Sequence, residues 1–400
     1  MRKTALILAA LALPAVLHSE AWRPSDAEIS AWNRIAAEKT GDCAFSPIGL
    51  AISVAMLGEG TTGVDRANIM ESFGLLSDFG STFSYVLKSY AESTASNAVS
   101  LTIAPSIWSR KIQKMETEYR HSLMRNFEAE TGLLSTPLPI NAWTEAKTDG
   151  RVTNVVGTID HRTDVLLLNA IAFEGAWQTP FDASLTKKEP FHSADGGVRQ
   201  VEMMHGEMEV QRLQDEKYTA VRVPFAVKGF SMLLLLPPKG VDVYSFRASF
   251  GKGISIDELK SRFRAASGEG FVSAQSASVR LRFAMPRIEM LSRWELTPII
   301  SMFKVPKKGY PRLGESATID EVLQYAYVKV SETGYSLTPG ARPPEPDKKD
   351  TRSRRARYYD DEDSKPAPAK ESFSMDHPFV FMVWDANTDT IVIAGQFTGR

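Results

Sequence analysis

Apolar residues are so dense in one early segment that a buried helix is the simplest interpretation. The sequence FSPIGLAISVAMLGEG, residues 45–60, is apolar on nearly every face of a helix. Ser46 suits the N-cap, and Pro47 suits the first helical position. Gly58 or Gly60 suits the C-terminal end. The pattern therefore predicts a helix inside the protein rather than an amphipathic surface helix.

Short apolar runs that end in proline or glycine predict interior strands. Two such runs are VLLLNAIAF, residues 165–173, and SMLLLLPP, residues 231–238. Near the C-terminus, FVFMVWD and TIVIAGQF flank residues 386–389, a pattern typical of a hairpin. Helical patterns dominate the first third and strand patterns the rest, without regular alternation. The predicted fold class is therefore α+β.

The first residues have the organisation of an export signal. Arg2 and Lys3 supply positive charge, an uncharged apolar run covers residues 5–17, and Ser19 and Ala21 are small residues at the two positions that a signal peptidase inspects. The run is too short to cross a bilayer comfortably. We expect residues 1–21 to be a signal peptide and the mature protein to be secreted, extracellular or, in a bacterium, periplasmic. The alternative is a buried N-terminal helix.

Composition excludes several classes of protein. The chain has 400 residues, 43% of them hydrophobic and 24% charged, with a formal net charge of −1. Such a balance gives no global attraction to nucleic acid or to an anionic membrane, and we expect neither as a partner. The single cysteine, Cys43, permits no intrachain disulfide and follows the pattern of a small core residue. Enzyme motifs such as G-x-S-x-G, H-E-x-x-H and the P-loop are absent from the sequence, so we expect no enzymatic activity, cofactor or metal.

Residues 340–371 differ from the rest of the chain. They contain almost no apolar side chains, several prolines and dense charge, so they cannot pack into a core. Nearly thirty residues of strand-like sequence follow them. The segment is therefore a long exposed excursion from a fold that is completed afterwards, and loops of this length are usually functional or disordered.

Several segments, in order along the chain, resemble the serpin family. They are FSPIGLAISVAMLGEGTTG from residue 45, INAWTEAKTDGRV from residue 140, LLLNAIAFEGAWQTPFDASLTKKEPFHSADGGVRQVEMM from residue 166, and MDHPFVFMVWDANTDTIVIAGQF from residue 375. The resemblance covers the chain from about residue 30 to its end. It implies one domain over residues 22–400, with three β-sheets, eight or nine helices and a reactive-centre loop at about residues 332–376.

The same resemblance implies a function. Members of this family usually inhibit serine proteases, and sometimes cysteine proteases. The protease cleaves the loop, which then inserts as a new central strand of the largest sheet and drags the tethered acyl-enzyme across the molecule. The energy comes from a native state held above its true minimum, so stability is kinetic.

Four residues match family positions that control the opening of that sheet. They are Ser46, Asn169, Trp177 and Gln324. Gln324 stands where the family usually has a histidine, eight residues before the hinge glutamate, and Gly49 stands where it usually has a serine. Glutamine still donates and accepts hydrogen bonds, so the buried network is expected to survive in altered form. Core packing is the alternative role for all four.

The hinge of the loop keeps only part of the family pattern, in which a glutamate and a glycine precede several alanines. Glu332 and Gly334 fit. Tyr335, Leu337 and Pro339 do not, and they occupy the alternate positions that would face the interior after insertion. Overpacking costs roughly 1–3 kcal/mol per misfit, and a proline in a central strand costs about as much again. The hinge therefore disfavours fast, complete insertion.

Basic residues in the loop are the candidate protease targets. The family's usual distance from the hinge places the scissile bond after Lys348. The cluster RSRRAR offers Arg354, Arg355 and Arg357 to trypsin-like or furin-like enzymes. Cleavage after Arg357 would leave about nine extra residues of tether, up to ~30 Å of slack. The residues most attractive to a protease are thus the poorest for trapping it.

Three functions remain open from the sequence. The protein is a monomeric inhibitor of proteases that prefer a basic residue, a non-inhibitory serpin whose loop is cut as a substrate or acts as a binding arm, or a protein whose loop binds a polyanion or a cation. The third is the weakest, because the acids at 360–363 largely cancel the neighbouring basic charge at a distance.

Overall fold

The structure is a computed structural model that describes residues 26–75, 78–95, 98–238, 240–266, 277–314, 316–334 and 371–400. The expected signal peptide and residues 335–370 of the expected loop lie outside this described part. Nine α-helices are found in the described residues, at α1 (Asp26–Ile35), α2 (Pro47–Glu59), α3 (Gly63–Ser72), α4 (Phe79–Thr94), α5 (Thr117–Phe127), α6 (Pro137–Lys147), α7 (Val243–Ala248), α8 (Ile256–Ala266) and α9 (Thr297–Ile300).

Strands dominate the second half of the chain, as the sequence pattern predicts, although the first three strands lie among the early helices. The strands are β1 (Cys43–Phe45), β2 (Val99–Ser109), β3 (Glu130–Leu133), β4 (Val165–Gly175), β5 (Asp182–His192), β6 (Val198–Gln214), β7 (Thr219–Pro224), β8 (Phe230–Leu236), β9 (Ala277–Pro286), β10 (Ile288–Glu295), β11 (Ile319–Val330), β12 (Glu371–Ser374), β13 (Phe379–Asp385) and β14 (Thr390–Phe397). Two short 3₁₀ turns lie at Ile112–Lys114 and Ser301–Phe303.

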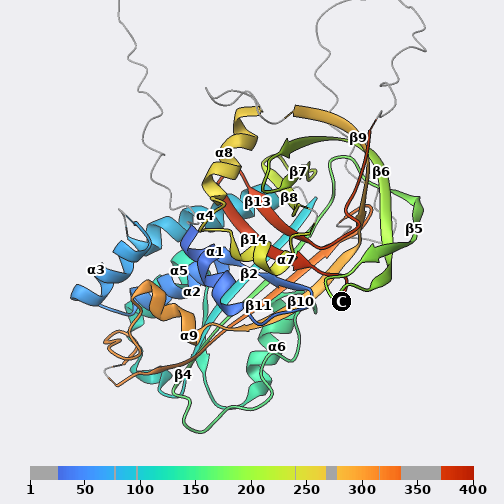
Figure 1. Ribbon diagram of the computed structural model, residues 1–400. Helices are drawn as coiled ribbons and strands as arrows, with labels where there is room; N and C mark the ends of the chain where they lie inside the picture. The colour runs from blue at the N-terminus through green and yellow to red at the C-terminus, as the bar shows by residue number, and fades with distance from the viewer. Residues whose placement is uncertain are drawn as a thin grey trace, which may run out of the picture.

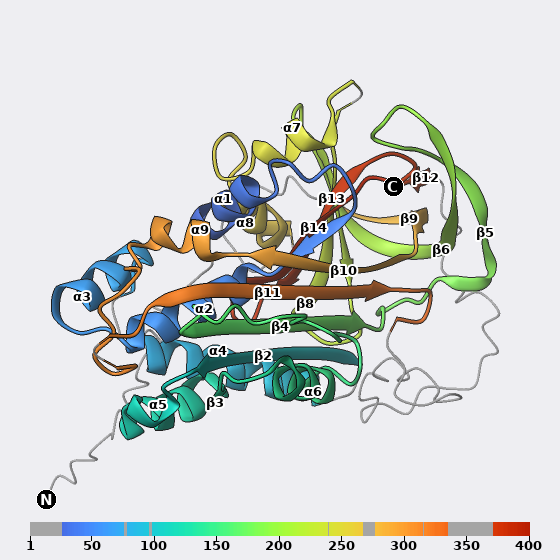
Figure 2. The ribbon, with the colours of Figure 1, turned by 90° about the horizontal axis from the view of Figure 1, so that it is seen from below.

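Hydrogen bonding joins the described strands into two sheets. The five-stranded sheet has the order β10-β11-β4-β2-β3 (Figure 2). The nine-stranded sheet has the order β1-β14-β13-β8-β7-β6-β9-β12, with β5 paired to β6. The resemblance implies three sheets, but the described strands form two, because the long β6 bonds to β5, β7 and β9 and joins them in one sheet. The α+β class is confirmed.

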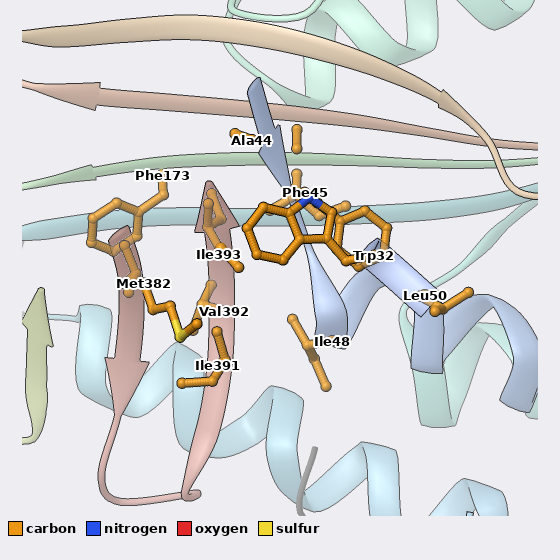
Figure 3. Packing of buried hydrophobic residues seen from close by; sticks show 14 of the residues in the cluster. Trp32, Ala44, Phe45, Ile48, Leu50, Phe173, Met382, Ile391, Val392 and Ile393 are labelled. Atoms are coloured by element: carbon orange, nitrogen blue, oxygen red, sulfur yellow. The ribbon is translucent and has the colours of Figure 1, made fainter. Parts of the chain in front are cut away.

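Helix α2 lies in the middle of the molecule, between the two sheets (Figure 1). All its residues are buried, Ser46 accepts a hydrogen bond from the amide of Gly49 at its N-cap, and Pro47 occupies its first turn. A helix apolar on every face needs partners on every face. It has them, because Ile48 and Leu50 share one cluster with Phe173 of β4 and with the hairpin of β13 and β14 (Figure 3). The predicted buried helix is confirmed.

The predicted strands and hairpin are also present. Residues 165–173 lie in β4, which is almost wholly buried, and residues 231–236 lie in β8. The segment 386–389 connects β13 to β14, which pair antiparallel. Cys43 is 3% exposed, and burial raises the pKa of its thiol to about 12. It is a core residue, as predicted.

One boundary of the expected loop differs from the prediction. Residues 371–374, which the family resemblance placed in the loop, form β12 and pair parallel with β9. Phe373 lies opposite Phe283, and their rings stack with centroids 6.2 Å apart. A single aromatic side chain among polar neighbours does not form a recognisable strand pattern in the sequence. Residues 371–374 form a strand because they pair with the edge of β9.

Gly395 gives a test of this packing. It pairs with Ala44 of β1 and Phe381 of β13, and a Cβ there would lie 2.2 Å from the buried Phe381 ring and 2.7 Å from the Cys43 carbonyl oxygen. We expect Gly395→Ala to destabilise the protein by about 1–3 kcal/mol, seen as a lower melting temperature. Gly253→Ala is the control, since its nearest neighbour would be 3.9 Å away. Equal melting temperatures for both variants would contradict the packing argument.

Candidate functional site: the β4–β11 seam and the loop hinge

The centre of the five-stranded sheet is a seam between two parallel strands. β11 pairs with β4 from Ile319–Val165 to Lys329–Glu174, with one irregularity near Ile319. Both strands run toward the end of the sheet at which Gly175 and Val330 lie, as Figure 2 shows. The expected loop leaves the sheet directly after β11, at this same end.

The two faces of the seam carry different side chains. On one face, alternate residues of β4 and β11 pack toward α2 and the main core. On the other face, Leu166, Leu168, Leu323 and Tyr325 belong to a second cluster with Ile140 of α6. The seam is therefore buried on both sides. Any strand that entered it would have to present small or apolar side chains to both clusters.

Gln324 and Asn169 lie opposite each other in the middle of the seam. The Gln324 side chain makes two hydrogen bonds to one residue, because its Oε1 accepts from the Ser46 amide at 2.8 Å and its Nε2 donates to the Ser46 carbonyl at 2.9 Å. Ser46 Oγ in turn donates to the Val392 carbonyl at 2.7 Å. The amide of Gln324 thus ties β11 to the start of α2, and through Ser46 to β14.

Asn169 makes the corresponding contact from β4. Its Nδ2 donates to the carbonyl of Gly49 at 2.9 Å. Its Oδ1 is buried and has no hydrogen-bond partner among the described residues. Leaving one buried acceptor unpaired costs about 1–3 kcal/mol. β4 and β11 are therefore both fastened to the first turn of α2, and separating them breaks at least one of these contacts.

The two departures from the family pattern, Gly49 and Gln324, lie against each other. A Cβ on Gly49 would be 2.9 Å from Gln324 Nε2 and 2.6 Å from Ile171 Cδ1. A serine at position 49 would meet the glutamine amide. The missing side chain at 49 makes room for the side chain at 324, so the two changes compensate each other. Gln324 thus takes part in a buried hydrogen-bond network with Ser46, whose hydroxyl donates to the Val392 carbonyl.

Trp177 lies two residues beyond the end of β4 and eight residues beyond Asn169, a distance of about 26 Å along an extended chain. Its ring stacks on Phe225 with centroids 4.6 Å apart, and its Nε1 donates to the carbonyl of Ser331 at 2.9 Å. The sequence grouped Trp177 with Ser46, Asn169 and Gln324. The structure brings the other three together around α2 and places Trp177 at the hinge.

Glu332 anchors the hinge. Its side chain is 7% exposed and forms an ion pair with Arg287, whose NH2 lies 2.5 Å from Glu332 Oε1. Thr186 Oγ1 donates to the same oxygen at 2.5 Å, and the Glu332 carbonyl accepts from the Phe181 amide at 3.0 Å. The first residues after β11 are thus held by the segment that follows β4.

Gly334 fits a space that no other residue could occupy. Its φ is +72°, and a Cβ would lie 1.9 Å from the carbonyl oxygen of Gly175 and 2.4 Å from the Cα of Ala176. The glycine is required because two backbone segments touch there. The two residues assigned to the hinge, Glu332 and Gly334, therefore both lie at the end of the seam, where the chain after β11 contacts the chain after β4.

The remaining predicted site residues lie outside the described residues. They are the hinge positions Tyr335 and Pro339 and the candidate scissile positions Lys348, Arg354, Arg355 and Arg357. In the described part of the chain, no group of three or more His, Cys, Asp or Glu side chains is arranged to hold a metal ion. Within the same residues, no helix has the length and apolar character needed to cross a membrane.

The sequence missed Arg287 and Thr186. Neither belongs to a motif, and they lie 45 and 146 residues from Glu332 along the chain. The only available signal was indirect, because a glutamate that is buried at a hinge requires a cationic or donor partner.

The contact between Gly49 and Gln324 generates a double-mutant test. We expect Gly49→Ser alone to destabilise the protein by about 1–3 kcal/mol, because the new side chain collides with Gln324 and Ile171. In the double variant with Gln324→Ala, the serine gains space, so the cost should be less than the sum of the single variants by at least ~0.5 kcal/mol. Thermal unfolding of the four proteins measures this coupling. Strict additivity would show that the two positions do not compensate each other.

The ion pair of Glu332 gives a pH test. Burial alone would raise the pKa of Glu332, but the hydrogen bonds from Arg287 and Thr186 outweigh burial and lower the pKa below its ordinary value of 4.5. A lowered pKa means that the ionised glutamate stabilises the folded state above pH 4.5, and that this contribution disappears as pH falls through the folded pKa.

We therefore expect Glu332→Gln to lower the melting temperature at pH 7, by an amount corresponding to about 1 kcal/mol. The difference from wild type should shrink on acidification below pH 4.5. Glu202→Gln is the control, because Glu202 lies 4.0 Å from the same arginine and is 43% exposed. A pH-independent difference would assign the effect to packing instead of charge.

Comparison with known proteins places this geometry in a family. The model of the family described as "Serpin (serine protease inhibitor)" matches residues 28–399. An uncharacterized serpin-like protein of Thermococcus kodakarensis is 24% identical over 88% of this chain and 79% of its own length. Ovalbumin of Coturnix coturnix is 27% identical over 64% of this chain and 61% of its own length.

A solved structure has the same fold. Native protease nexin-1 with heparin superimposes with a TM-score of 0.76 at 20% identity, covering 95% of this chain and 99% of that chain. At this identity the likeness establishes the fold alone. The family match, by contrast, spans nearly the whole chain and includes the seam, the first turn of α2 and the hinge. This chain belongs to the serpin family.

Proposed function

We propose that the protein is a secreted serpin that inhibits serine proteases with a preference for a basic residue, using the loop after Glu332 as bait. In this proposal residues 1–21 are removed on export, the mature protein acts as a monomer, and it has no enzymatic activity of its own. Serpins as a family generally inhibit serine proteases. What is new for this chain is the class of protease, the location and the bait.

The closed seam between β4 and β11 is the observation that carries the proposal. The two strands are parallel, and the loop starts where both of them end. A loop that folded back between them would run antiparallel to each. Insertion would break one parallel ladder and form two antiparallel ones, which are somewhat stronger per residue. The described sheet therefore has the geometry of a native state that can still gain from insertion.

Contacts at the hinge and in the middle of the seam oppose premature insertion. Glu332 must leave Arg287 before the hinge can move into the sheet, and Gln324 and Asn169 must separate. These contacts supply a barrier that cleavage of the loop would help to overcome, because a cut loop is no longer held at its far end. Kinetic stability of this kind is what a protease trap requires.

A second function is favoured by the hinge sequence. Tyr335, Leu337 and Pro339 are bulky or lack an amide donor, and each adds to the barrier for insertion. Every 1.4 kcal/mol on that barrier slows insertion about tenfold, whereas hydrolysis of the acyl-enzyme proceeds unchanged. If hydrolysis wins, the protein is a substrate or a binding arm instead of an inhibitor.

Incubation with trypsin separates the two functions. We expect the mature protein at a low molar ratio of trypsin to give a covalent 1:1 adduct that survives a denaturing gel. The replacement of Lys348, Lys349, Arg352, Arg354, Arg355 and Arg357 by glutamine should abolish cleavage in this part of the loop. Clean cleavage of the wild-type loop without an adduct would establish the second function.

A hinge variant completes this experiment. In Tyr335→Thr/Leu337→Ala/Pro339→Ala, the fraction of protein that ends as adduct should rise, because each change removes roughly 1–3 kcal/mol from the insertion barrier. Glu332 and Gly334 are left unchanged, so the variant and the wild-type protein differ only at the three substituted positions. The melting temperature of the cleaved product reports insertion independently of inhibition. No rise in that temperature for either protein would mean that the loop does not insert.

A further inference from the structure

A cavity of about 660 Å³ lies on the part of the nine-stranded sheet formed by β5, β6, β9 and β12. Figures 1 and 2 show these strands together at the end of the molecule beside the hinge. The cavity lies at an irregularity in the backbone pairing of β5 with β6. The pairing of β5 with β6 passes from Asp182–His205 to Lys187–Met203, so residues 183–186 leave the ladder. These residues form an arch at this break in the ladder, and Ser184, Leu185 and Thr186 of the arch line the cavity together with Gly206 of β6.

Apolar groups form much of the cavity wall. Phe283 and Phe373 line it from β9 and β12 with their rings stacked, and Ala284 lies beside them. Leu185 lines it from the arch and is 52% exposed. A cavity of this size, with an apolar wall and a few polar groups, has the character of a small-molecule site.

The charged side chains around the cavity differ in whether they have an ion-pair partner. Glu189 is already paired, since Lys187 and His205 each lie 3.1 Å from its Oε1. Glu207 lies 3.6 Å from Arg280. Arg282 also lines the cavity, and it has no hydrogen-bond or ion-pair partner within the described part of the chain.

The arginine that lacks a partner decides the charge of the ligand. Its guanidinium is always protonated and presents a planar fork of donors that matches a carboxylate. Arg282 is exposed, so its charge repels a cationic ligand and is available to pair with an anionic one. The favoured ligand is an anion with an apolar body.

We propose that this cavity binds a small organic anion, with its carboxylate on Arg282 and its aliphatic or aromatic body along Leu185 and Ala284, and that the bound ligand holds the loop hinge in place. The second half follows from Thr186, which lines the cavity from the arch and donates to Glu332 Oε1. A ligand that binds the arch in its described shape favours the state in which Thr186 holds Glu332. Occupancy and hinge release are therefore linked, and each must oppose the other.

Decanoate is a suitable probe for the site. Isothermal titration of the wild-type protein with decanoate should show saturable binding, and decyltrimethylammonium, with the same chain and the opposite charge, should bind at least about tenfold more weakly. Arg282→Gln should weaken decanoate binding about tenfold, because it removes a charge-assisted pair. Arg199→Gln is the matched control, since Arg199 is a half-exposed arginine of β6 that pairs with Asp195 outside the cavity.

A second variant tests whether binding requires the open volume of the cavity, independently of the charge of Arg282. Ser372 is exposed at the cavity rim on the edge strand β12, so Ser372→Trp fills the cavity without a change in the core. It should abolish decanoate binding while the melting temperature stays near that of wild type. Absence of binding to the wild-type protein would overturn the site. So would equal affinity for the two charged probes, or equal affinity of the wild-type, Arg282→Gln and Ser372→Trp proteins.

Hydrogen exchange tests the link to the hinge without any protease. The Phe181 amide donates to the Glu332 carbonyl, and the Gly334 amide donates to the Ser331 carbonyl. Decanoate should slow exchange of both amides in the wild-type protein. Thr186→Val keeps the shape of the cavity wall but removes the hydroxyl, so decanoate should still bind while the slowing disappears. Binding without any change in exchange would overturn the link, and this result does not depend on whether the protein inhibits a protease.

Discussion

Between β4 and β11 a single ladder of backbone hydrogen bonds holds together two parallel strands whose ends both face the loop. Everything else in the sheet is arranged around this seam. α2 supports one face through contacts that fasten both strands to its first turn, and the cluster around α6 covers the other. Because parallel pairing is weaker per residue than antiparallel pairing, the seam is the place where a returning strand gains most. The rest of the structure determines how difficult the entry is.

In the proposed insertion, two groups of side chains control that entry at different points. In the middle, Gln324 and Asn169 reach past the sheet to the start of α2. At the end, Trp177 and Arg287 hold the backbone and the side chain of the hinge. The first group resists separation of the strands, and the second resists movement of the loop. Since both must give way for insertion, a ligand or a substitution at either group changes the same barrier. The proposed cavity acts on the second group only.

Much of the architecture was predictable because its signals are local. The uninterrupted apolar pattern of residues 45–60 requires a buried helix wherever the rest of the chain lies, and the runs at 165 and 231 are too apolar for any exposed strand. Glu332 and Gly334 were recognisable because they fit the hinge pattern of the family that the chain resembles. The exception, β12, carries one aromatic residue among polar ones, and the edge of β9 decided its conformation.

The sequence by itself determined the α+β class, the buried helix, the family and the two hinge residues that the structure describes. Only the tertiary structure decided how the atypical residues fit. Gly49 and Gln324 look like two separate losses in the sequence, yet they share one space although they are far apart in the chain. Arg287 and Thr186 carry no motif and acquire a role only because folding brings them to Glu332. The arch of β5 likewise depends on how two strands pair. Periodicity and motif spacing encode local structure and ancestry, whereas contacts between distant residues are fixed by packing, which no local pattern records.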